Sequence, residues 1–291
     1  WNIVRELTNN KQIRTRKNEH PKTSKKKPPM SSTTDIPTLP TADTYKFPTH
    51  LLGSTASKDS VPTSEFAILV ACGSFNPITN LHLRMFENSK DFLEKERNTI
   101  VVGGYISPVH DGYSKTKNSL EVTADHRYLM CQLATKSSDW ITVDSWEFLQ
   151  PEYSRTRAVL THFKEEVDRF YGEKNQVSPR ILLLCGADLL ESFVKQGVWR
   201  PYDVEYILET FGTACVERDT TASIANLIFD HDVLYKNRKN IHSVPAYVTN
   251  NVSSTRIRTL IQRGYSVKYY LDDSVINYIK TNGVFDYLHD K

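Results

Sequence analysis

Long apolar runs are absent from this sequence of 291 residues. No stretch approaches the roughly eighteen uninterrupted apolar residues that a membrane-spanning helix needs, and the first residues lack the apolar centre of a secretory signal. We therefore expect a soluble, intracellular protein with no membrane partner. Hydrophobic residues still make up 39% of the sequence, which is enough for a packed core.

Cysteine is also scarce, and the four cysteines stand far apart in the sequence. None forms a C-x-x-C pair or lies at zinc-ligand spacing from a histidine, so the pattern predicts neither a metal site nor a redox role. We interpret them as small buried side chains in a reducing compartment. They are Cys72, Cys131, Cys185 and Cys215.

The net charge of +3 is unevenly distributed. The first fifty residues hold ten Lys or Arg and four Asp or Glu, which leaves the remainder near −3. Residues 1–62 are rich in Lys, Ser, Thr and Pro, and we expect them to form a disordered extension before one domain over 63–291. The lysines of "KTSKKKPPM" fit a nuclear-import signal, a weak polyanion contact or a plain solvated tail, so the expected compartment is the nucleus, the cytoplasm or both. Because the basic residues belong to this tail, we expect no nucleic-acid partner for the domain.

From Ser64 onward, apolar runs of strand length alternate with segments of helical period. The expected strands cover residues 66–73, 99–109, 140–148, 180–188, 212–218 and 240–248. Helices are expected after the first strand, over about 124–136, after the third strand, from about 222, and over 253–264 and 273–283. The helix between the third and fourth strands would bury Val159, Leu160, Phe163, Val167 and Phe170. This alternation predicts an α/β fold with a doubly wound parallel sheet, whose site lies outside the carboxyl ends of the strands.

The segment "GSFNPITNLH" (73–82) follows the first strand. It contains neither the G-x-x-x-x-G-K-[ST] loop of NTPases nor the G-x-G-x-x-G turn of dinucleotide folds. It offers a glycine that lets backbone N–H groups approach a ligand, then a helix N-terminus, then His82 one turn into the helix. The pattern favours a phosphate-binding loop, and the alternative is an ordinary capped turn with a surface histidine.

The segment "NNVSSTRIR" (250–258) has the features of a second anion site. Ser253 or Ser254 can cap the following helix, and Thr255, Arg256 and Arg258 gather donors at its positive end. Two arginines at a helix N-terminus are unfavourable unless an anion offsets them. The alternative is a solvated basic face.

Three ordered stretches, "GSFNPITNLHLRMFE", "LLCGADLLESF" with Trp199 following, and "VSSTRIR", closely resemble the eukaryotic nicotinamide mononucleotide adenylyltransferases. These belong to the nucleotidyltransferase superfamily, whose signatures are H-x-G-H and a later S-S-T-x-x-R. The resemblance extends over about residues 66–287. The H-x-G-H motif reads Thr79-Asn80-Leu81-His82 here, so His82 keeps the second histidine and Thr79 replaces the first.

The resemblance implies a reaction in which ATP and nicotinamide mononucleotide, or nicotinic acid mononucleotide, give NAD or its deamido form and pyrophosphate. It also implies Mg²⁺ as cofactor and a homo-oligomer. No general base is needed, because the attacking phosphate is already anionic and pyrophosphate is a stable leaving group. The alternatives are a sibling nucleotidyltransferase with another phosphorylated acceptor and a non-catalytic, chaperone-like relative.

The resemblance also assigns roles to individual residues, with His82 as the catalytic residue at the α-phosphate. Tyr153 stands where animal relatives have a second stacking tryptophan, which leaves the preference between the amide and the acid mononucleotide open. The expected ATP contacts are Gly73, Ser74, Phe75, His82, Gly186, Asp188, Asn250, Thr255, Arg256, Ile257 and Arg258. The expected mononucleotide contacts are Ser74, Lys115, Tyr153, Thr156, Val198, Trp199 and Arg218.

Overall fold

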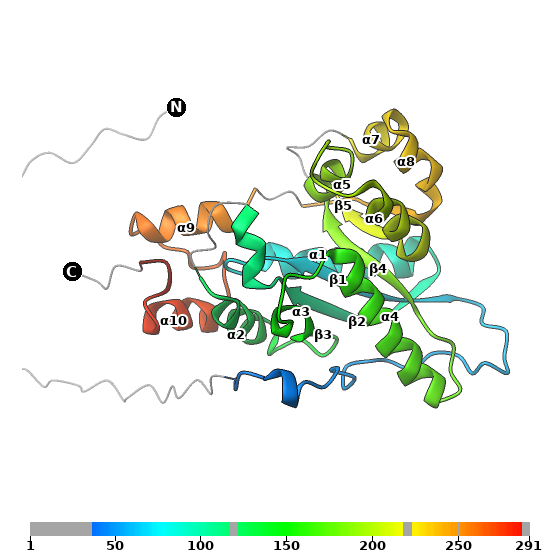
Figure 1. The fold of residues 1–291 in the computed structure, drawn as a ribbon, viewed down its shortest axis with the longest axis horizontal. Helices are drawn as coiled ribbons and strands as arrows, with labels where there is room; N and C mark the ends of the chain where they lie inside the picture. Colours follow the sequence, from blue (N-terminus) through cyan, green and yellow to red (C-terminus); the bar gives the residue numbers. More distant parts are fainter. Residues whose placement is uncertain (1–36, 117–121, 218–222, 249–250, 287–291) are drawn as a thin grey trace, which may run out of the picture. The chain divides into compact units, whose positions relative to one another are not determined.

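A computed structural model describes residues 37–116, 122–217, 223–248 and 251–286. Its centre is a six-stranded sheet in the order β3-β2-β1-β4-β5-β6, and every neighbouring pair is parallel (Figure 1). The strands are β1 (Glu65–Gly73), β2 (Thr99–Pro108), β3 (Ile141–Val143), β4 (Arg180–Gly186), β5 (Thr213–Val216) and β6 (Ile241–Val244). The predicted α/β class and doubly wound parallel sheet are confirmed.

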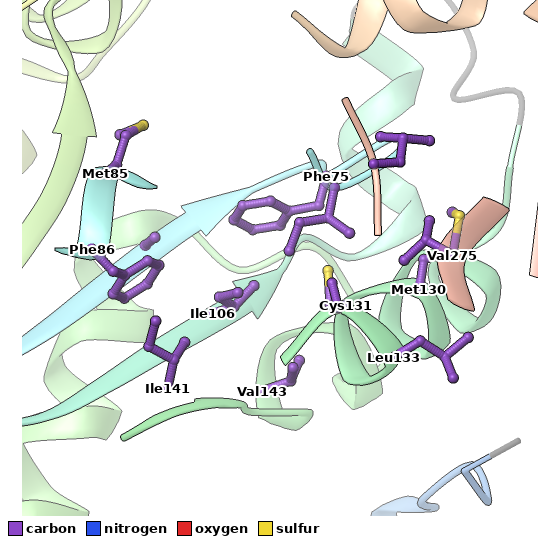
Figure 2. Close-up of a cluster of buried hydrophobic side chains, with 14 of the residues drawn as sticks. Phe75, Met85, Phe86, Ile106, Met130, Cys131, Leu133, Ile141, Val143 and Val275 are labelled. Carbon is purple, nitrogen blue, oxygen red and sulfur yellow. The ribbon is translucent and has the colours of Figure 1, made fainter. Parts of the chain in front are cut away.

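The two faces of the sheet are covered by two separate hydrophobic clusters. In β1, Leu69 belongs to one cluster, whereas Ile68 and Val70 belong to the other, as the alternation of side chains along a strand requires. The first cluster includes side chains of α1 (Asn80–Glu96), α2 (Ala124–Thr135), α9 (Ser254–Gln262) and α10 (Asp273–Thr281). Figure 2 shows part of it, with Phe75 and Ile106 among its buried side chains.

The second hydrophobic cluster packs against the opposite face of the sheet. It takes side chains from α4 (Thr156–Glu173), α5 (Ala187–Phe193), α6 (Pro201–Tyr206), the π-helical turn Ile207–Phe211, α7 (Ile224–Asp230) and α8 (Asp232–Lys236). Because helices cover both faces, the strands are apolar on both sides, which explains the unbroken run "ILLL" in β4. None of the helices in the described part of the chain is long and apolar enough to cross a membrane.

Two local predictions differ from the structure. The third strand ends at Val143, and the second half of its predicted range forms the short helix α3 (Trp146–Leu149). The chain turns there because Asp144 Oδ2 accepts a hydrogen bond from the Trp146 N–H at 3.0 Å. In α4, Tyr171 also belongs to the buried face, because it lies four residues after Val167, whereas Phe170 is only partly buried against the same cluster.

Residues 37–62, which were predicted as part of a disordered tail, lie against the domain. The Tyr45 hydroxyl donates to Asp144 Oδ1 at 3.0 Å and lies 2.9 Å from His162 Nε2. Phe47 stacks on Tyr105 with ring centroids 5.2 Å apart. The predicted boundary at residue 62 is therefore wrong for this segment, and residues 1–36 lie outside the described residues.

The cysteines take the predicted role of small apolar side chains. Cys131, Cys185 and Cys215 are buried, Cys72 is half-buried, and none of the four forms a disulfide. Cys185 and Cys215 lie side by side on β4 and β5, a pairing that their distance in the sequence does not reveal.

Candidate active site

The loop between β1 and α1 is tightly held at the carboxyl end of the sheet. The Val109 N–H donates to the Gly73 carbonyl at 2.9 Å, so the loops after β1 and β2 start together. Phe75 has a φ of 46°, in the left-handed region. A Cβ atom at position 73 would lie 3.3 Å from the Phe75 ring, so glycine is the residue that this close approach favours.

The orientation of His82 is set by Thr79, the N-cap residue of α1. The Thr79 backbone N–H donates to His82 Nδ1 at 2.9 Å, and the Thr79 hydroxyl lies 2.9 Å from the same nitrogen. Because a backbone N–H can only donate, Nδ1 carries the lone pair and a neutral imidazole holds its proton on Nε2. The contacts with Thr79 therefore place the proton of a neutral His82 on Nε2 and fix the direction of the ring.

The two predicted anion-binding segments are joined in the structure. Ser254 Oγ donates to the Pro77 carbonyl at 2.8 Å, and Arg258 Nη1 donates to the Asn76 carbonyl at 2.8 Å. Ser253 caps α9 by accepting from the Arg256 N–H at 3.3 Å. The N-terminus of α9 is thus docked onto the loop that carries His82.

The residues at this end of α9 divide into two groups. Thr255 and Arg256 are exposed, and the first turn of α9 holds no acidic residue. This placement is compatible with phosphate contacts, which remain predictions. Ile257 is 1% exposed, and its N–H donates to the Ser253 carbonyl at 3.0 Å. Its side chain and N–H are both used inside the domain, which leaves Ile257 no donor for a phosphate.

The loop after β4 carries the next group of predicted residues. Gly186 is the N-cap residue of α5, and Asp188 is exposed in its first turn. Trp199 is fixed in place, because its Nε1–H donates to Ser192 Oγ at 2.9 Å and its ring meets Phe193 edge-on with centroids 4.8 Å apart. The Val198 N–H donates to the Lys195 carbonyl at 3.3 Å, so the contact predicted for Val198 would have to use another part of the residue.

Tyr153 lies beside the loop that follows β2. Its side chain is 42% exposed, and its ring centroid is 5.5 Å from that of Tyr113. Burial, followed by the nearby Glu147, raises the pKa of Tyr153 to about 12, so the phenol stays neutral at physiological pH. Thr156 is the first residue of α4.

Three predicted residues have no described side chain. Lys115 belongs to a 3₁₀ turn over Asp111–Thr116, and its side chain lies outside the described part. Arg218 and Asn250 also lie outside it. Their roles remain predictions.

Arg127 is a residue that the sequence analysis missed. It is fully buried in α2, and its guanidinium donates to the carbonyls of Val122 at 3.2 Å, Ser74 at 2.9 Å and Val109 at 2.7 Å. It also pairs with Asp111 Oδ1 at 3.0 Å. Arg127 therefore holds the loops after β1 and β2 in one arrangement. The sequence could have indicated its importance, because Arg127 stands on an otherwise apolar face of the helix that was expected over about 124–136.

Two buried carboxyl groups beneath the same region were also missed. Ser107 Oγ donates to Glu147 Oε2 at 2.6 Å, and Asp144 receives the Tyr45 hydroxyl. Burial raises the pKa of Glu147 to about 8 and that of Asp144 to about 7. At pH 7, Glu147 is therefore largely protonated, whereas Asp144 is about half ionised.

The donors around His82 are imidazole, guanidinium, hydroxyl and backbone N–H groups. Across residues 37–116, 122–217, 223–248 and 251–286, no three His, Cys, Asp or Glu side chains are arranged to hold a metal ion. This donor set fits an anion, and a divalent cation at this place would be coordinated mainly by phosphate oxygens and water.

Comparisons with known proteins show which family this chain resembles in sequence. Residues 70–260 match the cytidylyltransferase-like family. The chain is 40% identical to nicotinamide/nicotinic acid mononucleotide adenylyltransferase 1 of Saccharomyces cerevisiae, with 84% of this chain and 61% of that protein aligned. It is 37% identical to the Bos taurus protein of the same name, with 75% and 88% aligned.

A solved structure shares the fold. It is the Plasmodium falciparum nicotinic acid mononucleotide adenylyltransferase complexed with NaAD, with a TM-score of 0.55, 16% identity, and 77% of this chain and 99% of that chain covered. The chain spans about three-fifths of the length of the two budding-yeast relatives, 61% and 62%. With the yeast and bovine identities and the joined anion-binding segments, the chain belongs to the cytidylyltransferase-like family and, within it, to the nicotinamide/nicotinic acid mononucleotide adenylyltransferases.

Proposed function

We propose that this chain transfers the adenylyl group of ATP to nicotinamide mononucleotide or nicotinic acid mononucleotide and releases pyrophosphate. The observation that carries the proposal is the docking of α9 onto the His82 loop through Ser254 and Arg258. It brings an oriented imidazole N–H and the basic end of a helix to one place, as a triphosphate requires. The relatives' names and the NaAD complex of the Plasmodium protein support the choice of substrates.

The reaction is an in-line displacement at the α-phosphorus of ATP. A phosphate oxygen of the mononucleotide forms the new P–O bond, the bond to the β-phosphate breaks, and its electron pair leaves with pyrophosphate. Since the nucleophile is already an anion, the protein has to align two anions and stabilise charge rather than remove a proton. The His82 Nε2–H would donate to an α-phosphate oxygen, and Thr255 and Arg256 would hold the outer phosphates.

The remaining residues would position the organic parts of the substrates. Trp199 presents a ring held by Ser192 and Phe193, and Tyr153 presents a neutral phenol, so both can stack on a pyridine ring. Asp188 would accept hydrogen bonds from the ATP ribose, as a carboxylate at a strand's end can.

Nucleotidyltransferases that use ATP generally work with a divalent cation, and we propose Mg²⁺ here. The N–H and hydroxyl donors around His82 suit anions rather than cations, so the ion would be coordinated mainly by the phosphates of ATP and by water. When bound, such an ion neutralises charge on the pyrophosphate.

The test is to incubate the purified chain with ATP, Mg²⁺ and each mononucleotide and to measure dinucleotide and pyrophosphate. We expect His82→Ala to lower kcat at least tenfold, which is about 1.4 kcal/mol of barrier. His231→Ala is the control, because this side chain makes no cap hydrogen bond at α8. A folded protein that forms neither dinucleotide would refute the activity, and product only with another phosphorylated acceptor would refute the choice of substrate. A smaller loss in His82→Ala would contradict its role.

A further inference from the structure

Two arginines share one buried aspartate between the Tyr153 and Trp199 segments. Arg155 is the N-cap residue of α4, two residues after Tyr153, and Asp203 lies in α6, four residues after Trp199. Asp203 has a side chain only 4% exposed. Arg157 Nε pairs with Asp203 Oδ1 at 2.8 Å, and Arg155 Nη1 lies 3.6 Å from Asp203 Oδ2. This bridge brings Arg155 to the part of the molecule where the pyridine ring is expected.

The two guanidinium groups are held differently. Arg157 makes the shorter ion pair and also lies over the rings of Tyr202 and Tyr206, at 5.1 and 5.4 Å from their centroids. Arg155 lies beyond hydrogen-bond distance from Asp203, and its side chain is 45% exposed. Arg157 is therefore committed to the α4–α6 contact, whereas Arg155 can turn toward a bound anion at little cost.

The charges in this region do not cancel. One carboxylate faces two guanidinium groups, which leaves an excess of one positive charge, and the exposed Arg200 and Glu152 nearby have opposite signs and offset each other. Glu147, on the side of Tyr153, is fully buried, and burial raises its pKa to about 8, so it is largely protonated at pH 7. The charge of Arg155 reaches Tyr153, where it opposes the larger effect of burial on the tyrosine pKa.

We propose that Arg155 makes the site prefer a mononucleotide whose pyridine ring carries a carboxylate, nicotinic acid mononucleotide, over the amide form. The inference rests on the function proposed above. A guanidinium matches a carboxylate through two parallel N–H···O bonds, whereas a carboxamide offers one acceptor and an NH₂ group that meets the guanidinium donor to donor. The same guanidinium could instead bind the 5′-phosphate, but that group is present in both substrates and would not discriminate between them.

The test compares kcat/KM for the acid and amide mononucleotides in the wild type, Arg155→Gln and Arg155→Lys. We expect a wild-type ratio of acid to amide above one. Arg155→Gln should lower the value for the acid about tenfold, as expected for one charge pair near a protein surface, and leave the amide within about twofold. Arg155→Lys keeps the charge but cannot make two parallel N–H···O bonds, so its kcat/KM for the acid should lie between the values of the wild type and Arg155→Gln. Arg169→Gln removes an equal charge farther along α4 and should leave the ratio unchanged.

The outcomes distinguish an error in the role of Arg155 from an error in the proposed function. An equal loss with both substrates in Arg155→Gln assigns Arg155 to the phosphate or to the α4–α6 contact and overturns the proposal. An unchanged ratio, or a wild-type ratio below one, also overturns it. If Arg155→Gln does not fold, the ratio in Arg155→Lys decides. Failure of the proposed function looks different, because the wild type then forms no dinucleotide from either mononucleotide.

Discussion

Thr79 and His82 are three residues apart, and this spacing decides which imidazole nitrogen can meet a substrate. As the N-cap and the third residue of α1, they lie within hydrogen-bond reach, and the Thr79 N–H occupies Nδ1. The sequence indicated His82 as a phosphate ligand but could not indicate its tautomer, because that depends on the partner of the other nitrogen.

Arg127 should be among the most costly residues to replace. Arg127→Met leaves the carbonyls of Ser74, Val109 and Val122 without their donor, and we expect the free energy of unfolding to fall by at least about 3 kcal/mol, measured by urea denaturation. The control is Arg97→Met, since exposed Arg97 mainly covers the Phe92 ring, and it should cost under about 1 kcal/mol. Similar losses in the two variants would contradict the role of Arg127.

At the level of elements, residues 37–62 act as an arm of the domain. Their apolar residues are too sparse for a periodic pattern, yet Tyr45 and Phe47 find partners in the loop after β3, in β2 and in α4. The predicted end of the third strand was wrong because a side-chain contact overrides the local pattern. Its second half is apolar enough for a strand, but the Asp144 side chain turns the backbone into a helix.

The arm should contribute measurably to stability. Phe47→Ala removes a ring packed on Tyr105 and Phe163, and we expect a loss of about 2 kcal/mol or more in urea denaturation. Tyr45→Phe leaves buried Asp144 without its hydroxyl donor and should cost about 1 to 3 kcal/mol. Leu39→Ala, at a side chain 43% exposed, should change stability by less than about 0.5 kcal/mol. An arm that contributes nothing would show three equal, negligible changes.

For the whole molecule, the strand order decides where the site lies. From β1 the chain continues through β2 to β3 on one side and then crosses to β4 on the other side, so β1 and β4 are neighbours. In such sheets ligands bind outside the carboxyl ends of the strands at this change of direction. The alternation of strands and helices predicted this class of fold. The order of the strands required the tertiary structure, because strands far apart in the sequence pair with each other.

Buried ionisable groups should make the stability of the whole molecule depend on pH. Burial raises the pKa of Asp144 to about 7 and of Glu147 to about 8, so above pH 5 the folded state binds more protons than the unfolded state and stability falls as pH rises. His162 and His242, with pKa values lowered by burial to about 4, act in the opposite direction only below about pH 6.5. We therefore expect decreasing stability from pH 6.5 to 8.5.

Glu147→Gln tests this pH dependence. It removes one linked proton and should flatten the slope by up to about 1.4 kcal/mol per pH unit, measured by urea denaturation across the range. Glu173→Gln, at an exposed residue near the end of α4, should keep the wild-type slope. A Glu147→Gln slope equal to that of the wild type would show that this carboxyl ionises freely in the folded protein.

Local patterns in the sequence were enough to predict the number and nature of the strands and the chain order of the motifs, because apolar periodicity and short motifs are local properties. Which donors are held within the protein, by contrast, depends on contacts between residues that lie far apart in the sequence. Arg258 reaches Asn76 across 182 residues and Arg127 reaches Ser74 across 53. Asp203 links the Tyr153 and Trp199 segments in the same way. A polar side chain takes the partner that folding places beside it, and the distance between the two along the chain carries no information about that choice.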